Sequence, residues 1–181
     1  LTWSLILACA TKLFKANKSL RGGSWRVPNL TGIELSEKTI GIVGLGRIGK
    51  RVAEIAEAFN MSIIAYDPYI DGIEFHDVGA ERVAFEEILK RADILSFHVP
   101  KTSETQHMLN RSHFEYINRG IILINTSRGS ILREQDLADA IEAGWIGGAG
   151  LDVFENEPLN PGSRLLLFEN LVLTPHVGAF T

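Results

Sequence analysis

Four ionisable side chains in the carboxyl-terminal third of the chain have the types and positions needed for acid–base chemistry on a small acid. Arg128 follows the apolar run IILIN, Asp152 and Glu157 lie in LDVFENEP, and His176 follows LVLTP. Ligands of open parallel sheets lie at the carboxyl ends of the strands, and all four residues fall there. A guanidinium can hold a carboxylate through two hydrogen bonds, and an imidazole can exchange a proton near neutral pH.

Each of these residues also has a simpler interpretation. Arg128 could form an ordinary surface ion pair, and Glu157 and the nearby Glu155 could both be solvated. His98, which ends another apolar run, is expected to be a packed histidine beside a loop that lines a cofactor. The functional interpretation therefore depends on the elements that surround these residues.

A glycine loop, GLGRIG, follows the apolar run TIGIV and precedes a segment of helical spacing. Gly44, Gly46 and Gly49 have the spacing G-x-G-x-x-G. In a dinucleotide-binding loop the first glycine permits a tight turn, the second lets the main chain approach a pyrophosphate, and the third lets helix and strand pack closely. The amides of Arg47 and Ile48 would then face the anion. Glycine loops also occur for purely structural reasons, but a strand before and a helix after this one favour a cofactor site.

An acidic residue stands where the adenosine ribose of such a cofactor would lie. Asp67 follows the run MSIIAY, at roughly the 20-residue separation from the glycine loop that this fold requires. Its carboxylate could accept hydrogen bonds from both ribose hydroxyls and would repel a 2′-phosphate, so NAD is expected rather than NADP. The alternative is that Asp67 serves only as a turn residue before Pro68.

The elements that would position these residues alternate along the chain. Runs of strand length without strict polar alternation, as in strands buried on both faces, cover 39–43, 61–66, 93–97, 121–125, 148–153 and 171–174. Segments of helical spacing cover 47–59, 85–92, 111–118 and 133–144, and Asn60 is expected to cap the first of them in a left-handed conformation. One helix is expected over LTWSLILACATKLF and a polar loop over 17–38. The alternation predicts an α/β fold, a doubly wound, mostly parallel Rossmann sheet with helices on both faces.

Composition narrows the classes of function. The length of 181 residues suits one domain with a single core. Lys plus Arg number 18 against 22 Asp plus Glu, so neither nucleic acid nor an acidic membrane is an expected partner. Cys9 is the one cysteine, which favours a reducing, cytoplasmic location. The apolar opening segment is too short to span a membrane, and His76, His107 and His113 lack ligand spacing, so no metal is expected.

Six short motifs resemble those of the D-isomer-specific 2-hydroxyacid dehydrogenases. GLGRIG, YDP, HVPKTSET, INTSRG, LDVFENEP and TPHVG occur in the same order and at about the same distances as in that family. The resemblance implies that Arg128 holds the substrate carboxylate, that His176 exchanges a proton with the substrate oxygen, and that Glu157 pairs with His176. It also implies that Asp152 lies near the nicotinamide and that further residues border the cofactor, namely Val99, Pro100, Thr105, Thr126, Ser127 and Gly178.

The resemblance extends to domain organisation and activity. Members of the family carry a substrate domain assembled from segments on either side of the nucleotide domain. Residues 1–181 would then be a dinucleotide-binding domain, a fragment without its substrate-binding domain and poor at turnover alone. The implied reaction transfers hydride between NAD and a D-2-hydroxy acid or 2-keto acid, with phosphoglycerate, glyoxylate and hydroxypyruvate as candidates. By the same analogy, the leading helix would help the parent protein to form a homodimer.

A different class of function stays open at this point. An NAD(H)-sensing module that recruits a protein partner, like the corepressors of this fold, can keep the same arginine, glutamate and histidine. NAD-dependent hydrolases with a similar nucleotide domain match less well, because they do not explain TSRG, ENEP and TPH together.

Overall fold

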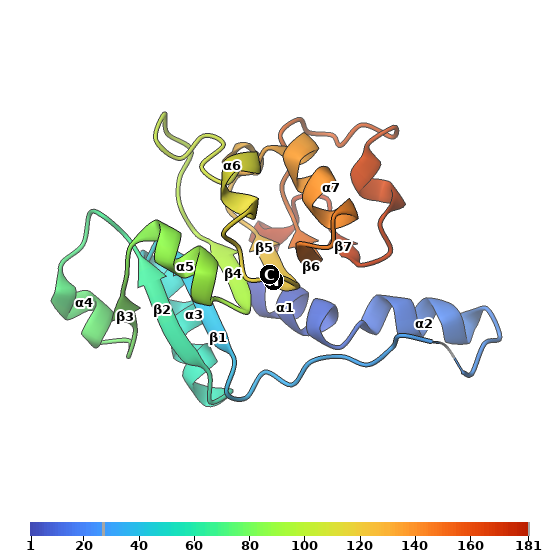
Figure 1. The fold of residues 1–181 in the computed structure, drawn as a ribbon, viewed down its shortest axis with the longest axis horizontal. Helices are drawn as coiled ribbons and strands as arrows, with labels where there is room; N and C mark the ends of the chain where they lie inside the picture. The colour runs from blue at the N-terminus through green and yellow to red at the C-terminus, as the bar shows by residue number, and fades with distance from the viewer. Residues whose placement is uncertain (27, 181) are drawn as a thin grey trace.

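A seven-stranded parallel sheet forms the centre of the protein, as seen in a computed structural model that describes residues 1–26 and 28–180 (Figure 1). The strands are β1 (Thr39–Val43), β2 (Ser62–Tyr66), β3 (Glu81–Arg82), β4 (Ile94–Phe97), β5 (Ile121–Asn125), β6 (Ile146–Leu151) and β7 (Leu171–Leu173). Their order in the sheet is β3-β2-β1-β4-β5-β6-β7. Strands β1 to β3 thus extend the sheet to one edge, and strands β4 to β7 extend it to the other. This order confirms the prediction of a doubly wound sheet. The loops behind β1 and β4 diverge, and ligands of such sheets bind in that crevice.

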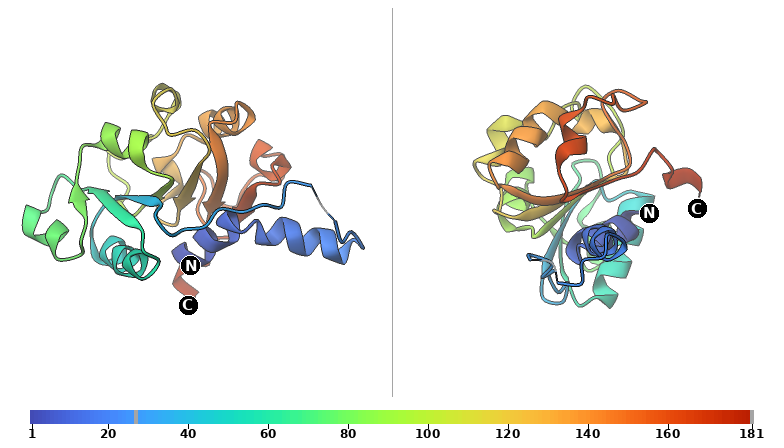
Figure 2. Two further views of the ribbon diagram at one scale, coloured as in Figure 1. Left: turned by 60° about the horizontal axis from the view of Figure 1, so that its bottom comes forward. Right: turned by 90° about the vertical axis from the view of Figure 1, so that its right-hand side faces the viewer.

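Helices cover both faces of the sheet (Figure 2). They are α1 (Thr2–Ala10), α2 (Leu13–Arg21), α3 (Arg47–Ala58), α4 (Gly72–His76), α5 (Phe85–Arg91), α6 (Arg111–Phe114) and α7 (Glu134–Glu142), with 3-10 turns η1 (Gly129–Ile131), η2 (Arg164–Leu167) and η3 (Gly178–Phe180). Two buried apolar clusters lie on the two faces. One joins the sheet to α1 and α3, and the other joins it to α5, α6 and α7. Ile40 and Ile42 of β1 belong to the first cluster and Val43 belongs to the second, as the alternation of side chains along a strand requires.

The amino-terminal segment differs from the sequence prediction. Instead of one helix followed by a polar loop over 17–38, the chain forms two helices, which are separated at Lys12 with a φ of 53°. Leu5 and Ile6 of α1 are buried, whereas α2 buries no residue and exposes Leu13 and Phe14. Most residues of α2 after Phe14 are polar, so the sequence pattern predicts a polar loop there.

Short elements account for the other differences. Strand β3, two residues long, pairs with β2 at the edge of the sheet, and α4 precedes it; neither is long enough to show a periodic pattern. Helix α6 ends at Phe114, before the predicted end of its segment, and β6 ends at Leu151, so that Asp152 follows the strand. The left-handed cap predicted at Asn60 is confirmed by a φ of 54°.

Candidate active site at the carboxyl edge of the sheet

The glycine loop behind β1 has the close backbone contacts that its spacing predicts. Gly44 has a φ of 91°, and a β-carbon there would lie 2.7 Å from the carbonyl oxygen of His98. A β-carbon at Gly49 would lie 2.1 Å from the Gly44 oxygen, so helix α3 packs directly against the loop. At Gly46 a β-carbon would meet no atom within 4 Å, which leaves open space in front of the loop.

The start of α3 can accept an anion. The helix begins at Arg47, its cap residue Gly46 provides no side-chain acceptor, and Arg47 and Ile48 are exposed. The first amides of a helix have no partner within the helix and carry a partial positive charge. Open space in front of Gly46 and uncapped amides behind it fit the pyrophosphate of a dinucleotide.

Asp67 links the end of β2 to this loop. Its Oδ2 accepts a hydrogen bond from the Leu45 amide at 2.9 Å, and its Oδ1 accepts one from the Tyr69 amide at 3.0 Å. A carboxylate offers about four acceptor positions, so about two remain for ribose hydroxyls. The turn interpretation and the cofactor interpretation of Asp67 are therefore compatible.

The loop behind β4 forms the opposite wall of the crevice. The Thr105 hydroxyl donates to the carbonyl oxygen of Pro100 at 2.6 Å and accepts from the Thr102 amide at 2.9 Å. Val99, directly before Pro100, lies against the position where a Gly44 β-carbon would stand. The predicted residues Val99, Pro100 and Thr105 therefore belong to one compact turn beside the glycine loop.

His98 is a packed histidine at the base of this wall. Its backbone amide donates to the carbonyl oxygen of Val43 at 2.7 Å, and its Nε2 lies 2.8 Å from the Ser96 hydroxyl. Burial lowers the pKa of His98 from 6.5 to about 4. The ring is consequently neutral at neutral pH.

Arg128 lies in a turn that Asn125 shapes. The buried side-chain oxygen of Asn125 accepts from the Ser127 amide at 3.0 Å and from the Ser127 hydroxyl at 2.8 Å, while its Nδ2 donates to the Arg128 carbonyl oxygen at 2.9 Å. The Thr126 hydroxyl lies 2.9 Å from that of Thr2 in α1. Sequence reasoning missed Asn125, although an asparagine at a strand end followed by Thr and Ser is typical of a side-chain turn.

The Arg128 guanidinium is free to bind an anion. It is exposed and donates to the carbonyl oxygen of Ser127 at 2.6 Å. Over residues 1–26 and 28–180, no carboxylate lies within ion-pair distance of it. The described part of the chain thus does not support the alternative of an ordinary surface ion pair.

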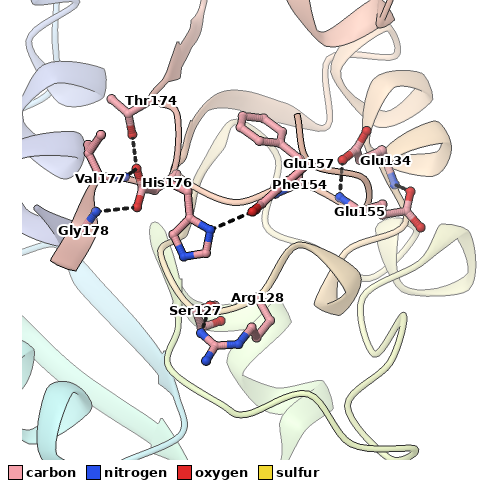
Figure 3. Close-up of polar contacts among 11 residues, drawn as sticks. Ser127, Arg128, Glu134, Phe154, Glu155, Glu157, Thr174, His176, Val177 and Gly178 are labelled. Carbon is pink, nitrogen blue, oxygen red and sulfur yellow. Dashed lines mark hydrogen bonds and ion pairs between the residues drawn. The ribbon is translucent and has the colours of Figure 1, made fainter. Parts of the chain in front are cut away.

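His176 and Glu157 form a pair (Figure 3). The Nδ1 of His176 lies 2.7 Å from Oε2 of Glu157, whose Oε1 accepts from the Phe154 amide at 3.1 Å. Partial burial would raise the pKa of Glu157, but the hydrogen bonds from His176 and Phe154 and the charge of the imidazolium outweigh it and hold this pKa below its ordinary value. The Glu157 carboxylate is therefore fixed by hydrogen bonds to protein groups and is not freely solvated.

Asp152 supports the turn that carries His176. Its carboxylate is 1% exposed and accepts from the Thr174 hydroxyl at 2.6 Å and from the amides of Val177 and Gly178 at 2.9 Å each. The His176 amide donates to the Asp152 carbonyl oxygen at 2.9 Å, and His176 has a φ of 52°. The contacts of Asp152 thus stabilise an otherwise unfavourable backbone conformation at His176.

Glu155 is only partly exposed and is bound by protein groups, contrary to the simpler interpretation of the sequence. Its Oε1 lies 2.7 Å from Nε2 of His107, and its Oε2 accepts from the Glu134 amide at 2.9 Å. The Glu155 amide donates in turn to the Glu134 side chain at 2.6 Å, and burial raises the pKa of Glu134. Glu155 fastens the loop behind β4 to the loop behind β6.

The three candidate catalytic residues line one open pocket of about 220 Å³. Arg128, Glu157 and His176 reach it from the loops behind β5, β6 and β7, and Lys101 and Phe154 also line it. A guanidinium there can bind a carboxylate, and an imidazole held by a carboxylate can donate or accept a proton. The glycine loop and Asp67 lie at the same edge of the sheet, behind β1 and β2.

Residues 1–26 and 28–180 contain no group of three or more His, Cys, Asp or Glu side chains arranged to hold a metal ion. Within the same residues, every helix is too short or too polar to cross a lipid bilayer.

The chain is similar to known proteins over almost its whole length. A family model described as "D-isomer specific 2-hydroxyacid dehydrogenase, NAD binding domain" matches residues 3–178. A glyoxylate reductase from Aeropyrum pernix is 43% identical over 99% of this chain and 56% of its own, and a D-3-phosphoglycerate dehydrogenase from Archaeoglobus fulgidus is 40% identical over 98% and 34%. The crystal structure of a D-lactate dehydrogenase from Aquifex aeolicus, complexed with NAD and lactic acid, superposes with a TM-score of 0.90 at 31% identity, over 99% of this chain and 59% of that one. The chain spans between a third and three fifths of the length of these proteins.

Proposed function

This chain belongs to the D-isomer-specific 2-hydroxyacid dehydrogenase family, of which it is an NAD-binding domain, and we propose that its parent protein interconverts a 2-keto acid and a D-2-hydroxy acid. The observation that carries the proposal is the shared pocket of Arg128, His176 and Glu157. When bound, the reduced nicotinamide supplies a hydride to the keto carbon. The protein must then bind the acid, orient it and deliver a proton to its oxygen.

His176 is the proposed general acid and base. In the reductive direction its imidazolium gives a proton to the keto oxygen as negative charge develops there, and in the oxidative direction the neutral ring accepts it. The Glu157 carboxylate holds Nδ1 and so fixes the orientation of the ring, which leaves Nε2 to face the substrate. Arg128 binds the substrate carboxylate and thereby sets which face of the keto carbon is presented.

The residues proposed to hold NAD lie along the same edge. Gly44, Gly46 and Gly49, with the amides of Arg47 and Ile48, would hold the pyrophosphate, and Asp67 would hold the adenosine ribose. The proposed neighbours of the rest of the cofactor are Val99, Pro100, Thr105, Thr126, Ser127, Asp152 and Gly178.

The test is a substrate panel on the full-length parent protein, with NADH oxidation followed by absorbance. Glyoxylate, hydroxypyruvate and phosphohydroxypyruvate correspond to the named relatives and to the sequence prediction. His176→Ala should reduce kcat by about 100-fold or more, and Arg128→Lys should raise KM by about 10- to 100-fold, because one amine cannot form the paired hydrogen bonds of a guanidinium. His76→Ala, an exposed histidine on α4, is the matched control and should leave both constants unchanged. The absence of turnover with every keto acid, or full activity in His176→Ala, would refute the proposal.

We propose that residues 1–181 supply the nucleotide-binding domain and that a substrate domain lies elsewhere in the parent protein. The proposal is supported by the partial coverage of the relatives and by the open pocket around Arg128. The isolated 181 residues should bind NADH yet reduce keto acids poorly, because water is not excluded from the reacting groups. Turnover by this fragment at the rate of the parent protein would contradict this.

We also propose that the parent is a cytoplasmic homodimer that uses α2. Leu13, Phe14 and Leu20 are each more than half exposed on this helix, an arrangement that a second copy of the chain could cover. The leading residues Leu5 and Ile6 do not take part, because they pack in the core. The proposed reducing location is supported by Cys9, because the sequence contains no second cysteine with which it could form a disulfide. Burial also raises the pKa of the Cys9 thiol to about 12. Sedimentation of Leu13→Ser/Phe14→Ser should show a shift toward monomer.

A further inference from the structure

Lys101 lines the candidate active-site pocket but has no part in the reaction proposed so far. It directly follows Pro100 in the loop behind β4, whereas Arg128 and His176 reach the same pocket of about 220 Å³ from the loops behind β5 and β7. Lys101 is exposed, and among residues 1–26 and 28–180 no carboxylate lies within ion-pair distance of its ammonium group. The charge and the three N–H donors of this group can therefore serve a bound molecule.

The loop that carries Lys101 is held against the pocket. The compact turn at its start, residues 100–105, is closed by a hydrogen bond of 2.6 Å across it. Further along the loop, the His107 amide donates to the carbonyl oxygen of Ser130 at 2.8 Å, and the His107 ring lies 2.7 Å from Oε1 of Glu155. Ser130 and Glu155 themselves line the pocket. The backbone around Lys101 is consequently fixed, so that mainly its side chain must be ordered when a ligand binds.

The pocket offers two cations to anionic groups. Its two carboxylates, Glu155 and Glu157, each accept hydrogen bonds from a backbone amide and lie within hydrogen-bond distance of an imidazole. Arg128 and Lys101 have no such carboxylate partner among the described residues, and they belong to different loops. A guanidinium matches one planar carboxylate, whereas an ammonium group makes point contacts with phosphate or carboxylate oxygens. One acid with two anionic groups can use both cations.

We propose that Lys101 is a specificity-determining residue that binds a second anionic group on the substrate, either a phosphate or a second carboxylate. The inference rests on the proposed function, because Arg128 must already hold the carboxylate beside the keto group. Lys101 then contacts the anion at the other end of the same molecule. The parent protein therefore favours dianionic keto acids over monoanionic ones, since only the former complete the charge-assisted contact with Lys101.

The test compares two pairs of keto acids on the full-length parent protein. Hydroxypyruvate and phosphohydroxypyruvate differ by a phosphate, and 2-oxobutyrate and 2-oxoglutarate differ by a carboxylate. Lys101→Ala should raise KM by about 10-fold or more for the dianionic member of at least one pair and leave the monoanionic members unchanged. Lys101→Arg should keep most of the preference, and Lys101→Glu should reverse it by repelling the second anion.

Lys90→Ala provides the matched control. Lys90 is an exposed lysine in the last turn of α5, shortly before β4 begins, and so lies at the opposite edge of the sheet from the pocket. This variant should show the wild-type KM for all four acids.

The outcomes separate this inference from the proposed function. A loss confined to one pair identifies the second anion as phosphate or as carboxylate, and a loss in both pairs shows that Lys101 accepts either. Unchanged KM ratios within both pairs in Lys101→Ala, or an equal rise for monoanionic and dianionic acids, would overturn the role of Lys101 while keto-acid reduction stands. A wild-type protein that reduces only the monoanionic acids would overturn it as well. No reduction of any acid would refute the proposed function, and this inference with it.

Discussion

The Nδ1 atom of His176 lies 2.7 Å from Oε2 of Glu157, although the two residues belong to loops behind different strands. This contact fixes the orientation of the imidazole and leaves Nε2 without a hydrogen-bond partner among residues 1–26 and 28–180. His176 and Arg128 line the same pocket, an arrangement that fits the proposed proton transfer to a bound acid.

Glu157→Gln in the full-length parent protein should keep a hydrogen bond to His176 but remove the negative charge next to the ring. The ring then lacks its ionic partner during proton transfer, so keto-acid reduction should fall about 10- to 100-fold. Measurements of kcat/KM for both proteins check this. An unchanged rate would show that the carboxylate charge plays no part.

Gly46→Ala and Gly49→Ala should separate cofactor binding from folding. A β-carbon at Gly46 meets no protein atom within 4 Å, so this variant should fold normally while NADH affinity falls by roughly 10-fold or more, because the methyl group occupies space needed by the pyrophosphate. At Gly49 the β-carbon would lie 2.1 Å from a backbone oxygen, and the variant should lose about 1–3 kcal/mol of stability. Urea unfolding and NADH titration of both variants are the measurements. Normal NADH binding by Gly46→Ala would argue against the placement of the pyrophosphate.

Asp152→Asn should loosen the turn that carries His176. The buried carboxylate accepts three hydrogen bonds, and an amide group would oppose at least one of the donors with its own N–H, at a cost of about 2 kcal/mol. The amides of Val177 and Gly178 should exchange with deuterium faster than in the wild type. Unaltered exchange at these two amides would mean that other contacts hold the turn.

His98 should contribute to the pH dependence of stability. Its pKa is about 4 in the folded protein and 6.5 in the unfolded chain, so the unfolded chain binds the extra proton between these values. Stability should therefore fall as the pH drops from 6.5 toward 4, by up to roughly 3 kcal/mol from this residue. His98→Gln should show a shallower loss in urea unfolding series across that range. Parallel curves for the two proteins would exclude His98 as a source of the slope.

The sequence by itself determined the parts of this protein that depend on local patterns. Buried strands and amphipathic helices can be predicted from the composition and spacing of their apolar residues. A glycine loop that binds a dinucleotide follows a strand and precedes a helix, and both neighbours could be predicted here. Arg128, Glu157 and His176 could be selected because each follows a strand, and parallel strands end at one edge of the sheet.

Only the tertiary structure decided what holds those residues in place. Asp152 beneath the His176 turn, Glu155 against His107, and the hydrogen bond from Tyr69 to Glu104 all join segments that are distant in sequence. Helix α2 and strand β3 were likewise not predicted from the sequence, since one is mostly polar after Phe14 and the other is two residues long. Hydrogen bonds between loops and the pairing of very short elements leave no periodic trace in a sequence, because their partners are set by the folded backbone and not by neighbours along the chain.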